Sequence, residues 1–218
     1  AILKLLKYPF KVIGITETRL IEGRTPTIPI ELDEYQFFAT STLSRAGGTG
    51  LYIHDSIASG LKVRQDLCFQ VEHSFETTFV EIIQSGRKNI LSGCIYKHPA
   101  FPSSKFVDEC LLKILEKINK EDKLVYLMGD FNINLLNYES STEVSDFYDA
   151  LSTYNFQPLV WHPSRITARS QTLIDNIFTN DLNYDYISEN LTCSISDHFP
   201  QFCIVTSYSF KKSKIKKK

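Results

Sequence analysis

The sequence predicts an α/β sandwich built from mixed β-sheets. Apolar runs of strand length recur along most of the chain, and two amphipathic segments of helical length interrupt them. This order is strand-rich and lacks the regular strand–helix alternation of a Rossmann fold or a TIM barrel. A chain of 218 residues can bury the core of one domain without help from a partner.

The expected strands are short apolar or alternating runs that lie between turn-forming residues. In chain order they cover residues 11–16, 35–40, 50–54, 61–65, 79–84, 89–96, 124–128, 159–161, 172–179 and 201–206. Aromatic residues make up 12% of the chain, so we expect an interior rich in Phe and Tyr.

Two segments repeat their apolar residues at helical spacing. In the first, residues 104–119, the apolar stripe consists of Val107, Cys110, Leu111, Ile114, Leu115 and Ile118. In the second, residues 143–154, it consists of Val144, Phe147, Tyr148 and Leu151. We expect Ser103 or Ser104 to cap the first helix.

The five cysteines are an odd number and contain no C-x-x-C pair. This pattern favours buried free thiols in a reducing compartment over disulfides or a zinc site. No stretch approaches the roughly 18 uninterrupted apolar residues that a membrane helix needs, so we expect no membrane partner.

The net charge of −1 hides an acidic body with a basic tail. Residues 211–218 hold six of the 24 basic residues, so the first 210 residues carry 18 bases against 25 acids. That net charge of −7 argues against nucleic-acid binding through bulk charge, and phosphates would be bound locally. We interpret residues 209–218 as a linker in preference to a DNA contact or a nuclear-localisation patch.

Several acidic residues stand at the ends of buried-looking strands or inside them. Glu17 follows residues 12–16, Asp130 follows residues 124–129, and Asp175 lies inside an apolar run. Asp197 and His198 lie between Ile195-Ser196 and Phe199-Pro200. A carboxylate in such surroundings needs a metal ion or hydrogen-bond donors, and ligand sites gather at strand ends in α/β folds. The pattern therefore predicts one convergent site.

Each of these residues also has a purely structural interpretation. Glu17 would cap a helix that begins at the next residue, and Asp130 would close its strand through an Asx-turn. Asp175 would pair with a buried Arg, and Asp197 and His198 would form a solvated turn. All of these interpretations must hold together for the site hypothesis to fail.

Four motifs resemble the endonuclease/exonuclease/phosphatase family in order and spacing. They are Ile15-Thr16-Glu17-Thr18, Gly129-Asp130-Phe131-Asn132, Leu173-Ile174-Asp175-Asn176-Ile177 and Ser196-Asp197-His198. Gly-Asp-Phe-Asn and Ser-Asp-His are weak signals alone and a strong signal as a set. Residues 44–50, 93–99 and 163–167 further resemble the apurinic-type endonuclease domain of non-LTR (LINE-type) retrotransposons.

The resemblance implies a DNase I-like fold over residues 1–208, a four-layer α/β sandwich of two mixed β-sheets flanked by helices. It also implies that the N-terminal strand is missing, because residues 2–6 look like the end of an amphipathic helix. In the family that strand ends in an Asn that reaches the site. We therefore expect weak metal binding and reduced or absent nicking by this chain.

The resemblance implies a divalent cation, Mg²⁺ or Mn²⁺, and a group that activates water. Glu17 would ligate the cation, and Asp197 would lie at it or beside it. Asp130 would orient and deprotonate the attacking water, and Asn132 would help to hold the water or the phosphate.

The remaining matched residues would act on the DNA. Asp175 would fix the tautomer of His198, and His198 and Tyr96 would contact the scissile phosphate. Arg165 and Thr167 would lie near the DNA, within residues 165–171, a candidate hairpin for reading its sequence.

The function so implied is a metal-dependent DNA endonuclease that leaves a 3′-hydroxyl primer for reverse transcription. Its partners would be double-stranded DNA and the reverse transcriptase domain of the same polyprotein, and it would act in the nucleus after cytoplasmic synthesis. Two alternatives stay open, a phosphatase or phospholipid phosphodiesterase of the same fold and a non-catalytic remnant that binds nucleic acid or a protein. Apurinic repair activity is less expected, because we place Trp161 in the core and not in a sugar pocket.

Overall fold

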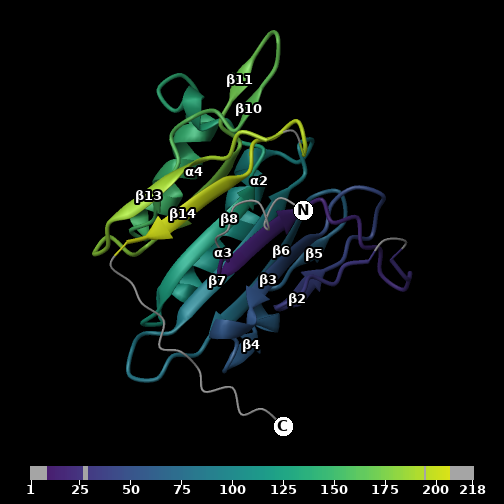
Figure 1. Ribbon diagram of the computed structural model, residues 1–218. Coiled ribbons are helices and arrows are strands. Elements are labelled where there is room, and N and C mark those ends of the chain that lie inside the picture. Colours follow the sequence, from purple (N-terminus) through teal and green to yellow (C-terminus); the bar gives the residue numbers. More distant parts are fainter. Residues whose placement is uncertain (1–8, 27–28, 194, 207–218) are drawn as a thin grey trace.

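A seven-stranded mixed sheet forms the centre of the computed structural model, which describes residues 9–26, 29–193 and 195–206 (Figure 1). Its main path runs through β4 (Leu61–Val63), β6 (Phe75–Ile82), β7 (Ile90–Lys97), β8 (Leu124–Asp130), β12 (Asp175–Thr179) and β9 (Gln157–Pro158). A short strand, β5 (Gln70–Val71), pairs with β6. β7 and β8 are parallel and the other pairs are antiparallel, which confirms the expected mixed sheet.

A smaller antiparallel sheet packs against one face of the large sheet. It is formed by β1 (Val12–Thr16), β3 (Thr49–His54) and β2 (Tyr35–Thr40), in that order. Two ribbons complete the strands, β10 (Arg165–Ile166) with β11 (Gln171–Thr172) and β13 (Tyr186–Asn190) with β14 (Gln201–Val205). Among the described residues, β1 is hydrogen-bonded in its sheet only to β3, and β14 only to β13.

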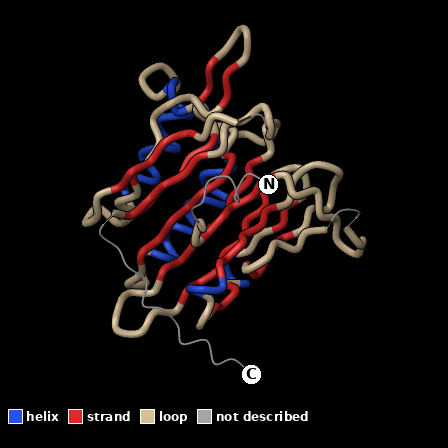
Figure 2. Tube along the Cα trace, viewed as in Figure 1, coloured by secondary structure: helices blue, strands red, loops and turns tan. Residues whose placement is uncertain are grey.

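The helices cover the other face of the large sheet (Figure 2). α2 (Ser103–Phe106), a π-helical segment (Val107–Leu111) and α3 (Leu112–Ile118) follow one another as the predicted first helix, and α4 (Thr142–Thr153) is the second. The expected serine cap is wrong, because Pro102 occupies the N-cap position and no side chain caps the helix. Short 3₁₀ turns lie at Asp55–Ile57, Gln65–Leu67 and Leu135–Asn137.

Alternation along β7 shows how the sheet separates two apolar cores. Leu91 and Ile95 face the helices, whereas Ile90 and Cys94 face the small sheet. The helix-side core is rich in phenylalanine, as the composition predicts. The described residues therefore form three layers: the helices, the large sheet and the small sheet. The expectation of a fourth layer is wrong for these residues, because no described helix covers the outer face of the small sheet.

Side chains replace backbone ladders at two places where the sequence predicts strands. The strand expected at 159–161 is absent, because the Asn176 amide bonds the N–H and C=O of Val160. The strand expected at 172–179 is split into β11 and β12. Between them the N–H of Leu173 donates to the Asn134 side chain, and that of Ile174 donates to the Ser164 hydroxyl.

All five cysteines are free, as expected, and Cys94 and Cys110 are buried. None of the helices in the described ranges is long and apolar enough to cross a membrane. The helix end expected at residues 2–6 and the basic tail, residues 209–218, lie outside the described residues.

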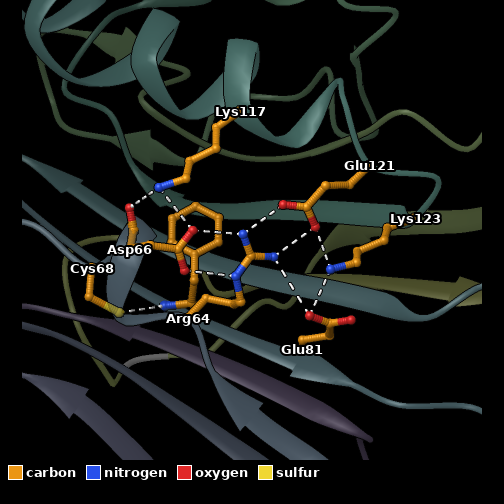
Figure 3. Close-up of polar contacts among 8 residues, drawn as sticks. Arg64, Asp66, Cys68, Glu81, Lys117, Glu121 and Lys123 are labelled. Carbon is orange, nitrogen blue, oxygen red and sulfur yellow. Dashed lines mark hydrogen bonds and ion pairs between the residues drawn. The ribbon is translucent and has the colours of Figure 1, made fainter.

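A buried ion-pair network joins the outer strands to the α3–β8 connection (Figure 3). Arg64, only 5% exposed, makes hydrogen bonds of 2.7–2.8 Å to both carboxylate oxygens of Asp66 and of Glu121. Lys123 donates to Glu81 on β6 over 2.7 Å and also pairs with Glu121. Such bidentate contacts of a guanidinium fix the start of β8 relative to β6.

We expect Arg64→Leu to lower the free energy of unfolding at pH 7 by about 3 kcal/mol, because it leaves carboxylates without their buried partner. Hydrogen bonds from Arg64 hold the pKa of Asp66 and of Glu121 below their ordinary values. A lowered folded-state pKa stabilises the protein above the unfolded pKa, near 4, and this contribution is lost as the pH falls. Urea unfolding at several pH values should show the difference from wild type shrinking below about pH 4.

Lys88→Ala is the matched control, since it removes a cation from an exposed ion pair with Asp122. Its effect should stay within about 0.5 kcal/mol at each pH. An equal effect of the two substitutions would contradict a structural role for the Arg64 network.

Candidate functional site

The register of four neighbouring strands places four polar side chains in one row across the end of the large sheet. Glu76 on β6 lies opposite Tyr96 on β7, Tyr96 pairs with Asp130 on β8, and Asp130 pairs with Asp175 on β12. Side chains directly opposite one another point to the same face of a sheet. Here that face is the one that carries the small sheet.

Gly129 lets β7 and β8 stay paired up to this row. Its φ is +144°, and a Cβ built on it would lie 1.9 Å from the carbonyl oxygen of Ile95. No side chain fits such a contact with backbone, so the residue before Asp130 must be glycine.

Asp175 and His198 form a hydrogen-bonded pair of 2.8 Å between Oδ2 and Nδ1. Ser164 holds the pair together although the chain separates its members. Its buried hydroxyl accepts the N–H groups of Ile174 and Asp175, each at 3.1 Å, and its carbonyl accepts the N–H of Phe199 at 2.7 Å. The Nε2 atom of His198 is therefore the ring nitrogen left to face a ligand.

Asp130 joins this pair in a cluster of three side chains that could hold a metal ion. Ligand atoms of Asp130, Asp175 and His198 all lie within 4.8 Å of one another. Burial and the neighbouring Asp175 raise the pKa of Asp130 to about 7. The hydrogen bond to Asp175 raises the pKa of His198. A buried carboxyl group with a raised pKa beside a second carboxyl group is typical of functional sites.

Glu17 reaches the row from the small sheet. It follows β1 and accepts a hydrogen bond of 3.0 Å from the Tyr96 hydroxyl, while its other oxygen lies 3.5 Å from Arg19. Burial, assisted by the charge of Glu17, raises the pKa of Tyr96, so the phenol stays a hydrogen-bond donor. A side chain from each sheet therefore contributes to one site.

Asn132, two residues after Asp130, adopts a left-handed backbone conformation with φ of +48°. Its N–H donates to Asp130 Oδ1 at 3.0 Å, which is the Asx-turn considered as an alternative from the sequence. Its side-chain nitrogen donates to the carbonyl of Lys97 at 2.8 Å. The turn and the site hypothesis therefore hold together, since the turn aims Asp130.

Asp197, Arg165 and Thr167 lie outside the cluster. Asp197 is exposed and pairs with Arg165 at 2.6 Å, and Arg165 bridges to His198 through the backbone. Thr167 bonds Ser170 at the tip of the β10–β11 hairpin, which projects from the body in Figure 1. Trp161 is 61% exposed, so the expectation that it lies in the core is wrong.

Sequence reasoning assigned no role to three buried residues of the site. Glu76 is a member of the row and lies in no motif. Lys97 and Ser164 lie inside the motif segments 93–99 and 163–167, and they bond Asn132 and Asp175. Their roles depend on which strands become neighbours, and single-chain patterns do not show this.

A groove that leads to the site lies between β1 and β14. It has a volume of about 850 Å³ and a mainly apolar lining, to which these two strands and the large sheet contribute, and it reaches Asp175 and His198. The pair is therefore open to a ligand from outside.

In the metal-free protein we expect the pKa of His198 to exceed 6.5, the ordinary value, and to fall toward that value in Asp175→Asn. The physical reason is the loss of a negative hydrogen-bond acceptor at Nδ1. NMR titration of the ring protons measures this pKa, and His54, whose pKa burial lowers, is an internal control that should not change. An unchanged pKa of His198 would show that the pair does not form in solution.

Comparison with solved structures shows the fold. The endonuclease domain of TRAS1, a telomere-specific non-LTR retrotransposon, matches with a TM-score of 0.61, 14% identity and coverage of 80% of this chain and 81% of that chain. An endonuclease/exonuclease/phosphatase family protein from Leptotrichia buccalis matches with a TM-score of 0.58 and 12% identity, over 90% of this chain and 87% of that chain. D. rerio TDP2 complexed with a single-strand DNA product matches with a TM-score of 0.63 and 16% identity, over 93% of this chain and 87% of that chain.

Neither family models nor curated proteins match the sequence. At these identities the likeness establishes the architecture and not the activity. The chain has the endonuclease/exonuclease/phosphatase (DNase I-like) fold, as the sequence motifs predict.

Proposed function

We propose that this protein is a metal-dependent phosphodiesterase that nicks DNA. The observation that carries the proposal is the cluster of Asp130, Asp175 and His198 next to Tyr96, with Glu17 reaching Tyr96 from the small sheet. It combines clustered carboxylates with an oriented imidazole, which hydrolysis of a phosphodiester requires. The likeness of the fold to nucleases supports the same class of reaction.

The donors present fit a hard divalent cation, Mg²⁺ or Mn²⁺. The carboxylates of Glu17 and Asp130 offer oxygen ligands, and Asp130 carries an excess of negative neighbours that a cation would relieve. When bound, the ion would supply charge neutralisation on the phosphoryl oxygens. Asp197, which pairs with Arg165, is proposed to lie at the edge of this site.

The residues of the chain then divide the remaining roles between them. Asp130 accepts a proton from the attacking water, and Asn132 orients that water or the phosphate. His198, protonated on both ring nitrogens, donates a hydrogen bond from Nε2 to a phosphoryl oxygen, while its Nδ1–H donates to Asp175. The oxygen of water forms the new bond to phosphorus and the P–O3′ bond breaks. Solvent water protonates the departing O3′, and Asp130 later releases the proton that it took from the attacking water, so the products are a 3′-hydroxyl and a 5′-phosphate.

A finer proposal concerns the biological role. A 3′-hydroxyl made in double-stranded target DNA would prime reverse transcription by a polymerase domain of the same polyprotein, in the nucleus. The likeness to the endonuclease domain of a non-LTR retrotransposon and the quoted sequence motifs support it.

A phosphatase is the second candidate, because the family name of the Leptotrichia buccalis relative includes that activity. Phosphate release from inositol phosphates or from 3′-phosphorylated DNA, with supercoiled plasmid left uncut, would favour it over nicking.

We expect nicking of supercoiled plasmid in Mg²⁺ or Mn²⁺ and none in EDTA. Asp130→Asn and His198→Gln should each slow nicking about 100-fold or more, because the first removes the proton acceptor and the second removes the charged donor to the phosphoryl oxygen. Gel assays measure the rate, and extension of the nicked product by a DNA polymerase tests for the 3′-hydroxyl.

Asp146→Asn, an exposed acid on α4, is the matched control and should nick like wild type. Equal rates in wild type, Asp130→Asn and His198→Gln would refute the proposed chemistry and leave the non-catalytic alternative.

Asp197→Asn separates two roles for that residue. If Asp197 only neutralises Arg165, its removal frees the guanidinium for one phosphate, so DNA binding tightens and the salt slope steepens by about 0.9. Fluorescence anisotropy at several salt concentrations, in the Asp130→Asn background to prevent cleavage, measures both. Asp146→Asn controls for the change in net charge, and weaker Mn²⁺ binding without tighter DNA binding would instead assign Asp197 to the metal.

A further inference from the structure

Glu76 is a buried carboxylate at the end of the catalytic row, and none of the proposed proton transfers uses it. It is 3% exposed and lies directly opposite Tyr96 across β6 and β7. An ionisable group in such a place needs strong hydrogen-bond donors. The position of such donors in the chain indicates which segment Glu76 anchors.

Those donors lie in the loop that leads into β3. Burial raises the pKa of the Glu76 carboxylate, and the Thr42 hydroxyl and the Gly48 N–H beside it act in the opposite direction and favour the ionised form. The carboxylate rests directly on Gly47, where an added Cβ would lie 2.8 Å from Oε1. Gly47 and Gly48 have φ of +108° and +87°, so glycine suits both positions for steric and conformational reasons.

The same two glycines hold the segment that carries Glu17. The carbonyl of Gly47 accepts the N–H of Arg19 at 2.9 Å, and that of Gly48 accepts the N–H of Thr18 at 3.3 Å. Glu17 and Arg19 have φ of +51° and +54°, a conformation that non-glycine residues keep only when their surroundings enforce it. The glycine turn supplies that enforcement.

We infer that Glu76 is a positioning residue that sets the direction of Glu17. The Glu76 carboxylate anchors the Gly47–Gly48 turn. The turn holds the backbone of the two residues that follow Glu17 in the chain. The Glu17 carboxylate is thereby directed toward Tyr96 and the cluster. The inference rests on the proposed function for its effect on metal binding, whereas its effect on the backbone does not depend on it.

Two measurements on the whole chain test this inference. In Glu76→Ala, exchange of the Arg19 amide hydrogen, followed by NMR, should accelerate at least about fivefold, the loss expected when a turn loses a hydrogen bond. Calorimetry with Mn²⁺ alone should show about tenfold weaker binding, as for removal of a group that orients a metal ligand.

Two further variants keep the test sharp if Glu76→Ala folds poorly. Glu76→Gln retains one acceptor oxygen for the Gly48 N–H, so it should recover most of the amide protection and of the Mn²⁺ affinity. Gly47→Ala pushes on the same contact from the other side and should reproduce the defect. Glu72→Ala, which removes an exposed glutamate from the turn between β5 and β6, should match wild type in both measurements.

The outcomes distinguish the inference from the function on which it rests. Unchanged exchange at Arg19 in both Glu76→Ala and Gly47→Ala would overturn the positioning role. Faster exchange with unchanged Mn²⁺ affinity would overturn the link to metal binding. Glu17→Gln is the reference, because normal Mn²⁺ binding by that variant would refute the proposed metal ligand while the exchange data still judge Glu76.

Discussion

The register of β6, β7, β8 and β12 is the constraint on which the rest of the site depends. A shift of one residue in any of these pairings would turn a polar member of the row to the helix side of the sheet. Gly129 protects the register at its most crowded point, since the backbone of Ile95 occupies the space of a side chain. The position of Asp130 therefore follows from backbone packing more than from its own contacts.

Buried carboxyl groups have opposite surroundings at the two ends of the large sheet. Glu81 and Glu76 lie five residues apart on β6, about 16 Å along the strand. Around Glu81, guanidinium and ammonium groups satisfy the carboxylates and lower the pKa of that residue. Around Asp130, carboxyl groups face one another, and the pKa rises to about 7. The first arrangement stabilises the fold. The second leaves the Asp130 carboxyl group without an ion-pair partner among the described residues, so the site favours binding a cation or a proton.

The site also depends on how two sheets pack. Asp130 and Asp175 belong to the large sheet, Glu17 comes from the small one, and His198 precedes β14. Gly14 on β1 lies so close to Met128 that a Cβ would approach its sulfur to 2.6 Å. This close approach of the layers brings Glu17 within hydrogen-bond distance of Tyr96. Ser164 performs the corresponding function for Asp175 and His198.

The sequence by itself determined the fold class, most of the strands, both helices, and the acids and histidine that converge, because local periodicity and compact motifs are properties of neighbouring residues. The tertiary structure alone decided that β13 forms, that the Asn176 side chain replaces the strand predicted at 159–161, and that Asp197 pairs with Arg165. It also decided the place of Glu76, Lys97 and Ser164 beside the site. These outcomes depend on contacts between distant segments, and the free energy of such contacts is set by which strands lie side by side and leaves no periodic pattern in the chain.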